Sequence, residues 1–152
     1  MTTTKSKFEY QYSSSQLDHT YGYLTTPLLT MLPPPSAPDL QHSFDAVISV
    51  EVIEHLSNPK ALVTAAKYCL KPEGTFILTT PYHGYLKNLA LAVSGKMDDH
   101  FTVLWDGGHI KFFSVSTLSK LLEAESCADI EFKYAGRIPY LWSSMLCMCK
   151  VN

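Results

Sequence analysis

The stretch FDAVISVEVIEHLSNPKAL, residues 44–62, decides the fold. Its first seven residues, 44–50, are a compact run rich in β-branched and apolar side chains, which predicts a strand buried on both faces of a sheet. Asn58 and Pro59 are residue types that open helices, and apolar residues then recur at helical spacing as far as Leu70. A buried strand followed closely by an amphipathic helix predicts an α/β fold.

A second strand completes this unit. The predicted helix must end before Pro72, and Gly74 supplies the turn that follows it. The segment TFILTT, residues 75–80, then predicts a strand that ends at Pro81. Strand, helix and strand at these lengths predict a parallel βαβ unit.

The remainder of the chain extends the α/β pattern. Residues 85–93 are weakly helical and apolar, whereas residues 94–113 have no clean period and predict a long functional loop. Serine caps and spaced leucines predict a helix within 114–126. Two further strands are expected at 128–136 and 142–152.

Proline marks the clearest boundary in the sequence. Residues 1–32 are largely polar, with a short amphipathic helix predicted in 21–32. Three consecutive prolines and Pro38 then exclude helix and ladder pairing, so we expect a linker at 33–43. The α/β unit occupies 44–152.

Composition limits the class of protein. The chain has 152 residues, 46% of them hydrophobic and 17% charged, which fits one globular domain. A net charge of -2 gives no general attraction to nucleic acid or anionic membranes. No apolar run approaches the roughly 20 residues that span a bilayer, and residues 1–12 are polar, so a cytoplasmic location is expected. The four cysteines lack CxxC spacing and are predicted to be reduced, buried thiols.

Two carboxylates and an imidazole follow the first strand. Loops beyond the carboxyl ends of strands form ligand sites in open α/β sheets, so Glu51, Glu54 and His55 are site candidates. Helical spacing would aim Glu51 at the same point as Glu54 or His55, and this set suits a divalent metal. His109 is the natural further ligand and His83 a weaker one. The alternative is that the glutamates are solvated or act as caps, with His55 bonded to a backbone carbonyl.

Three motifs together carry a resemblance to a known family. FDAVISVEVIEHLSNPKAL, CLKPEGTFILTTPY and GGHIKFFSVSTLSKLLEA, in this order, resemble the second half of a class I S-adenosylmethionine-dependent methyltransferase over residues 44–152. In particular, they resemble the ubiquinone-biosynthesis-like O-methyltransferases and the enzymes that methylate the 2′-hydroxyl of small-RNA 3′ ends. The resemblance implies a partial Rossmann-like sheet with an antiparallel last strand, and methyl transfer from S-adenosylmethionine to an acceptor hydroxyl.

The resemblance also implies roles for individual residues. Glu51, Glu54, His55 and His109 match a family pattern that holds Mg²⁺ or another divalent metal. With the metal, Glu54, His55 and His109 would be catalytic; without it, His55 would be a general base.

The two substrates would lie on either side of these residues. Ser49, Val50 and Glu51 would lie near the methionine part of the cofactor. Tyr82 and Trp105 would line the acceptor side, or else pack as structural aromatic residues.

One departure from the family pattern is decisive. Such enzymes hold the cofactor on a Gly-rich turn after the first strand, and this sequence has no GxG. Residues 12–33 resemble the segment that precedes that strand, which predicts an internal deletion of the cofactor-binding half at the proline-rich junction. Removal of the flanking strand would expose an apolar sheet edge, so a marginal fold or a homodimer through that edge is expected.

Three functions remain open from the sequence. The first is a methyltransferase acting on a small-molecule acceptor, with cofactor binding impaired by the loss. The second is a non-catalytic metal-binding or interaction module, and the third is a nonfunctional fragment. The acidic balance and the absence of a Lys/Arg run disfavour a nucleic-acid acceptor.

Overall fold

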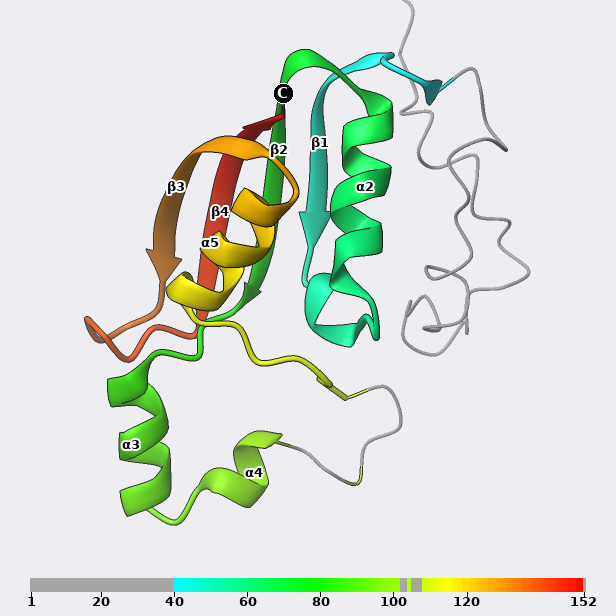
Figure 1. Ribbon diagram of the computed structural model, residues 1–152. Coiled ribbons are helices and arrows are strands. Elements are labelled where there is room, and N and C mark those ends of the chain that lie inside the picture. The colour runs from blue at the N-terminus through cyan, green and yellow to red at the C-terminus, as the bar shows by residue number, and fades with distance from the viewer. Residues whose placement is uncertain (1–39, 102–103, 105–107, 152) are drawn as a thin grey trace, which may run out of the picture.

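A computed structural model describes residues 40–101, 104 and 108–151 of the chain. The helix predicted in 21–32, most of the proline-rich linker and Trp105 lie outside these residues. Within them the elements follow in chain order (Figure 1): β1 (Phe44–Val50), the 3-10 helix η5 (Ile53–His55), α2 (Pro59–Cys69), β2 (Leu70–Pro81), α3 (Tyr85–Val93), α4 (Met97–Phe101), α5 (Val115–Ala124), β3 (Cys127–Ala135) and β4 (Ser144–Val151).

The strands form one four-stranded mixed sheet in the order β1-β2-β4-β3. β1 and β2 are parallel, and α2 connects them, which confirms the predicted βαβ unit. β4 runs antiparallel to β2 and to β3, as expected for the last strand. Val50 pairs with Thr79, and Thr79 pairs with Leu146, so the carboxyl ends of β1 and β2 lie beside the start of β4.

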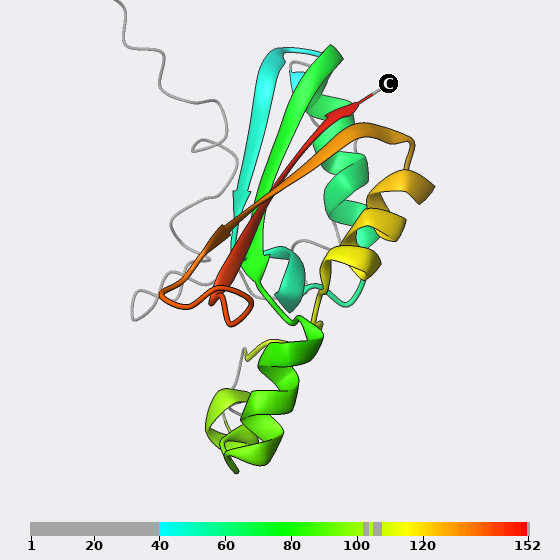
Figure 2. The ribbon, with the colours of Figure 1, turned by 90° about the vertical axis from the view of Figure 1, so that its left-hand side faces the viewer.

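Helices α2 and α5 cover one face of the sheet (Figure 2). Alternate residues of β2 and β4 point toward these helices and are buried. The largest fully buried apolar side chains of this core are Phe76, Ile53, Leu70, Leu78, Leu118, Leu122 and Met145. All four cysteines are buried free thiols, as predicted.

The prediction that β1 is buried on both faces is wrong. Val47 and Ser49 face the helices and are buried, but the side chains between and after them, Ile48 and Val50, are 63% and 61% exposed. In the described part of the chain, helices pack on only one face of the sheet, so the apolar side chains on the other face meet solvent. β1 is also an outer strand of the sheet that the described residues form.

β2 begins earlier than the sequence indicates. The strand starts at Leu70 rather than after Gly74, and it includes Pro72. Pairing with β1 jumps from Phe44↔Leu70 to Ala46↔Thr75, so an irregularity takes up the extra residues that were predicted to form a turn.

Two small helices lie beyond the carboxyl end of β2 (Figures 1 and 2). α3 coincides with the predicted helix at 85–93, whereas α4 lies in the segment predicted to be a loop. Neither α3 nor α4 has a buried residue. No helix among the described residues is long and apolar enough to cross a membrane.

Candidate metal centre

A sharp change of backbone direction after β1 creates the site. Glu51 has a positive φ of 49°, and its N–H donates to both the carbonyl oxygen (3.2 Å) and Oγ1 (3.1 Å) of Thr79 on β2. The chain then enters η5, which Ile53 anchors in the core with no exposed surface. This turn presents Glu54 and His55 at the carboxyl end of β1.

Backbone hydrogen bonds bring a distant loop to the same place. The N–H groups of Ile110 and Lys111 both donate to the carbonyl oxygen of Glu54, at 2.9 Å each. This contact spans more than fifty residues of sequence and fixes the segment that precedes α5. His109, the residue before this contact, is thereby held beside η5.

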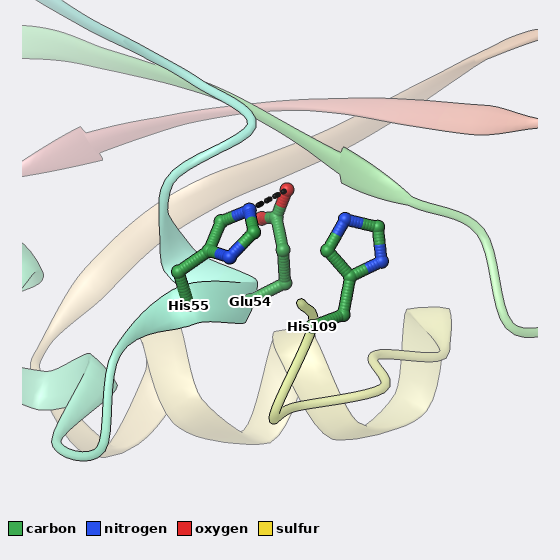
Figure 3. Close-up of side chains that lie close together, drawn as sticks. All are labelled: Glu54, His55 and His109. Carbon is green, nitrogen blue, oxygen red and sulfur yellow. Dashed lines mark ion pairs between the residues drawn. The ribbon is translucent and has the colours of Figure 1, made fainter. Parts of the chain in front are cut away.

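Glu54, His55 and His109 form a group with the donor set of a metal site (Figure 3). One carboxylate oxygen and one nitrogen from each imidazole all lie within 4.8 Å of one another. His55 Nε2 lies 3.8 Å from Glu54 Oε1, and the imidazole centroids are 4.9 Å apart with an interplanar angle of 68°. One carboxylate and two imidazoles are ligands that Mn²⁺, Fe²⁺ and Zn²⁺ accept.

The buried carboxylate of Glu54 is only half satisfied. Its side chain is fully buried, and Oε2 accepts a hydrogen bond from Thr80 Oγ1 at 3.0 Å. Oε1, the oxygen that faces His55, has no hydrogen-bond partner among the described residues. Burial, with the negative charge of Glu51 adding to it, raises the pKa of Glu54 to about 7. A bound cation would stabilise the ionised form, so the residues present fit a metal.

The electrostatics of His109 favour the same role. Its partial burial and the neighbouring His55 lower the pKa of the His109 imidazole. A lowered pKa keeps the ring neutral near pH 7, and neutral imidazole is the form that binds a metal.

Glu51 does not join the group. Its Oε1 accepts a hydrogen bond from Ser144 Oγ at 3.0 Å, at the start of β4. The group therefore contains Glu54, His55 and His109 but not Glu51. Glu51 acts instead as a second carboxylate close enough to raise the pKa of Glu54.

His83 lies in a separate aromatic cluster. The ring is only 6% exposed and sits 5.4 Å from the His100 ring and 5.0 Å from the Phe112 ring, centroid to centroid. Burial lowers the pKa of His83 to about 4. The weaker ligand candidate is thus packed among other side chains and is not in the three-residue group.

The predicted acceptor and cofactor residues are more dispersed. Tyr82 packs edge-on against Trp142 and Tyr134, which fits the structural alternative for this aromatic residue. Ser49 and Val50 point to opposite faces of β1, and Val50 is largely exposed. No glycine occurs between residues 23 and 73 of the sequence, so β1 and its flanks have no Gly-rich turn. The described residues therefore do not fit S-adenosylmethionine by themselves.

Sequence reasoning missed the hydroxyl groups that contact the two glutamates. Thr80 on β2 donates to the Glu54 carboxylate, and Ser144 at the start of β4 donates to the Glu51 carboxylate. The signal for Thr80 was present, because period-two alternation places it on the buried face with Phe76 and Leu78. A hydroxyl at a buried strand position requires a partner.

Comparisons with known proteins agree with this fold. The sequence profile of a family described as a methyltransferase domain matches residues 13–131. The ubiquinone biosynthesis O-methyltransferase of Dinoroseobacter shibae is 34% identical over 94 residues, which cover 59% of this chain and 36% of that protein. The enzyme of the same name from Cereibacter sphaeroides is 31% identical over 104 residues, covering 66% of this chain and 40% of that protein.

Solved structures have a similar fold. The CMeT domain of citrinin polyketide synthase superposes with a TM-score of 0.57 at 16% identity, over 77% of this chain and 30% of that chain. A SAM-dependent methyltransferase from Archaeoglobus fulgidus gives a TM-score of 0.51 at 13% identity, over 86% of this chain and 66% of that chain.

The chain belongs to the class I S-adenosylmethionine-dependent methyltransferase family. Its four-stranded sheet is similar to part of the Rossmann-like sheet of that class. The chain spans about two fifths of the length of the curated relatives that it matches.

Proposed function

We propose that this chain carries the acceptor side of an O-methyltransferase, with a divalent metal bound by Glu54, His55 and His109. The observation that carries the proposal is the fully buried Glu54 carboxylate, which lies in one group with His55 and His109 and whose Oε1 has no hydrogen-bond partner among the described residues. A buried, half-satisfied carboxylate is costly unless a proton or a cation compensates it. The position of the group at the carboxyl end of β1 also suits a ligand site.

Each of the three side chains would supply a metal ligand. Glu54 supplies the negative charge, and His55 and His109 supply imidazole nitrogens. A metal held there would orient the acceptor hydroxyl and lower its pKa. If no metal binds, His55 would take the hydroxyl proton as a general base.

The acceptor is proposed to be a small molecule with a hydroxyl group. The names of the matched relatives support this class, since they are ubiquinone biosynthesis O-methyltransferases. The net charge of -2 does not favour a nucleic-acid acceptor. Tyr82 and Trp105 are proposed to border this acceptor, and the chain is proposed to be cytoplasmic.

The cofactor side is proposed to be deficient in this chain. We divide the sequence into 1–32, the junction 33–43 and the acceptor half 44–152. Ser49, Val50 and Glu51 would contact S-adenosylmethionine only if another surface completed the pocket. β1, an outer strand with exposed apolar side chains, supports pairing with a second copy of the chain. A metal-binding module without catalysis is the alternative, which the half-satisfied Glu54 equally supports.

Two titrations test the proposal. Mn²⁺ is titrated calorimetrically into the wild-type chain and into His109→Gln, with His83→Gln as the matched control. Binding by wild type and His83→Gln, but not by His109→Gln, is expected; equal binding by all three would refute the site. S-adenosylmethionine is then titrated with Mn²⁺ present. Micromolar affinity would show that the chain completes the cofactor pocket, whereas no binding at millimolar concentration would support the metal-binding module.

A further inference from the structure

We propose that Thr80 is a positioning residue of the metal centre, which fixes the Glu54 carboxylate so that Oε1 alone is the metal ligand. The inference rests on the metal site proposed above. Thr80 is the second of two threonines at the end of β2 and has no exposed surface. Its hydroxyl donates to Glu54 Oε2 at 3.0 Å, between two fully buried residues.

This hydrogen bond makes the two carboxylate oxygens inequivalent. Oε2 is occupied by the Thr80 hydroxyl, whereas Oε1 lies 3.8 Å from His55 Nε2 and has no hydrogen-bond partner among the described residues. A carboxylate that already accepts a hydrogen bond on one oxygen is directed toward monodentate coordination through the other. Hydrogen bonds of this kind orient metal ligands and strengthen metal binding.

The sheet explains why Thr80 can act in this way. β1 and β2 are parallel and pair in register at Val50↔Thr79, so the residue after Thr79 reaches the turn that follows β1. Thr79 meanwhile accepts the N–H of Glu51 and holds the start of that turn. Adjacent threonines thus fix the backbone and the carboxylate of one ligand-bearing segment. Because both belong to a paired strand, the position of the hydroxyl is set by the sheet and not by a loop.

A series of substitutions at residue 80 tests the role. Thr80→Val keeps the size and branching of the side chain but removes the hydroxyl, and Thr80→Ser keeps the hydroxyl. Mn²⁺ affinity is measured from the electron paramagnetic resonance signal of free Mn²⁺. We expect Thr80→Val to bind Mn²⁺ about tenfold to a hundredfold more weakly than wild type, and Thr80→Ser to bind like wild type. Thr75→Val, near the middle of the same strand, is the matched control.

A second pair of variants, Thr80→Ser and Thr80→Ala, separates an effect on folding from an effect on ligand position. Both lack the Cγ2 methyl group of threonine, so their comparison isolates the hydroxyl even if Thr80→Val does not fold. The expected result is tighter Mn²⁺ binding by Thr80→Ser than by Thr80→Ala. If Thr80→Val bound Mn²⁺ as tightly as Thr80→Ser, and Thr80→Ala also bound it as tightly, the proposed role of Thr80 would be overturned and the metal site itself would stand. Absence of Mn²⁺ binding by the wild-type chain would instead overturn the proposed metal site, and the role of Thr80 with it.

Discussion

Replacing Glu54 by Gln should change how the stability of the metal-free protein depends on pH. Burial raises the pKa of Glu54 from 4.5 to about 7, so the folded state disfavours the ionised carboxylate. A folded-state pKa above the unfolded one contributes stability that is fully present below pH 4.5 and is lost as the pH rises through 7. Each pKa unit corresponds to about 1.4 kcal/mol, so the loss is on the order of 3 kcal/mol.

Glutamine keeps an oxygen that can accept the Thr80 hydrogen bond but has no carboxyl proton to lose. Urea unfolding, followed by circular dichroism, measures the free energy of unfolding of both proteins at pH 4 and pH 8 with a chelator present. Relative to Glu54→Gln, the wild-type chain should lose about 3 kcal/mol between these pH values. Adding Mn²⁺ in excess of the chelator at pH 8 should restore stability to the wild type only, because the cation binds the folded state.

Glu123→Gln is the matched control, since it removes a carboxylate from the exposed side of α5. Its pH profile should run parallel to that of the wild type. If the free energy of unfolding of Glu54→Gln changed with pH in the same way as that of the wild type, the Glu54 carboxylate would not be buried as the structure shows. The argument for a cation at this position would then fail.

Further predictions concern the remainder of the fold. Burial lowers the pKa of His83 from 6.5 to about 4, so the contribution of His83 to stability is present above pH 6.5 and is lost as the pH falls through 4. His83→Phe should remove this loss of roughly 3 kcal/mol at acid pH. Unfolding measured at pH 4 and pH 7 checks the difference. Leu118→Ala should cost about 2–5 kcal/mol in the free energy of unfolding because Leu118 lies on the fully buried side of α5, whereas Ile48→Ala on the open face should cost about 0.5 kcal/mol or less. Ser114→Ala should cost about 1 kcal/mol in the same assay, because Ser114 and Thr117 form the capping box that begins α5.

The fold followed from local signals that agree with one another. The apolar run of β1, Pro59 at the start of α2 and the serine caps before α5 each predict the element that the structure contains. The start of β2 was missed because Pro72 and Gly74 are turn residues, and only the pairing with β1 shows that the strand continues through them.

The exposure of β1 could not be predicted from its own residues. An apolar, β-branched run is typical of a strand that is buried on both faces of a sheet. The sequence of the strand does not show whether other elements pack on both faces. Ile48 and Val50 keep the apolar character of a covered strand although they are exposed.

The candidate site was predicted in part. Spacing singled out Glu51, Glu54 and His55, and the sequence favoured His109 over His83 as the further ligand. The backbone contacts of Ile110 and Lys111 with Glu54, which hold His109 beside this group, appear only in the fold. Glu51 was expected to bind the metal, yet the turn at its positive φ directs its carboxylate to Ser144. Such contacts between distant segments are properties of the folded chain and leave no periodic pattern in the sequence.

The most direct test of the metal centre is paramagnetic broadening of histidine ring signals by Mn²⁺. Substoichiometric Mn²⁺ is added to the chain, and the ring proton resonances are followed by nuclear magnetic resonance. The account predicts that the signals of His55 and His109 broaden first, while that of His42, beside the start of β1, persists. Uniform broadening of all histidines, or no broadening of His55 and His109, would contradict a metal site formed with Glu54.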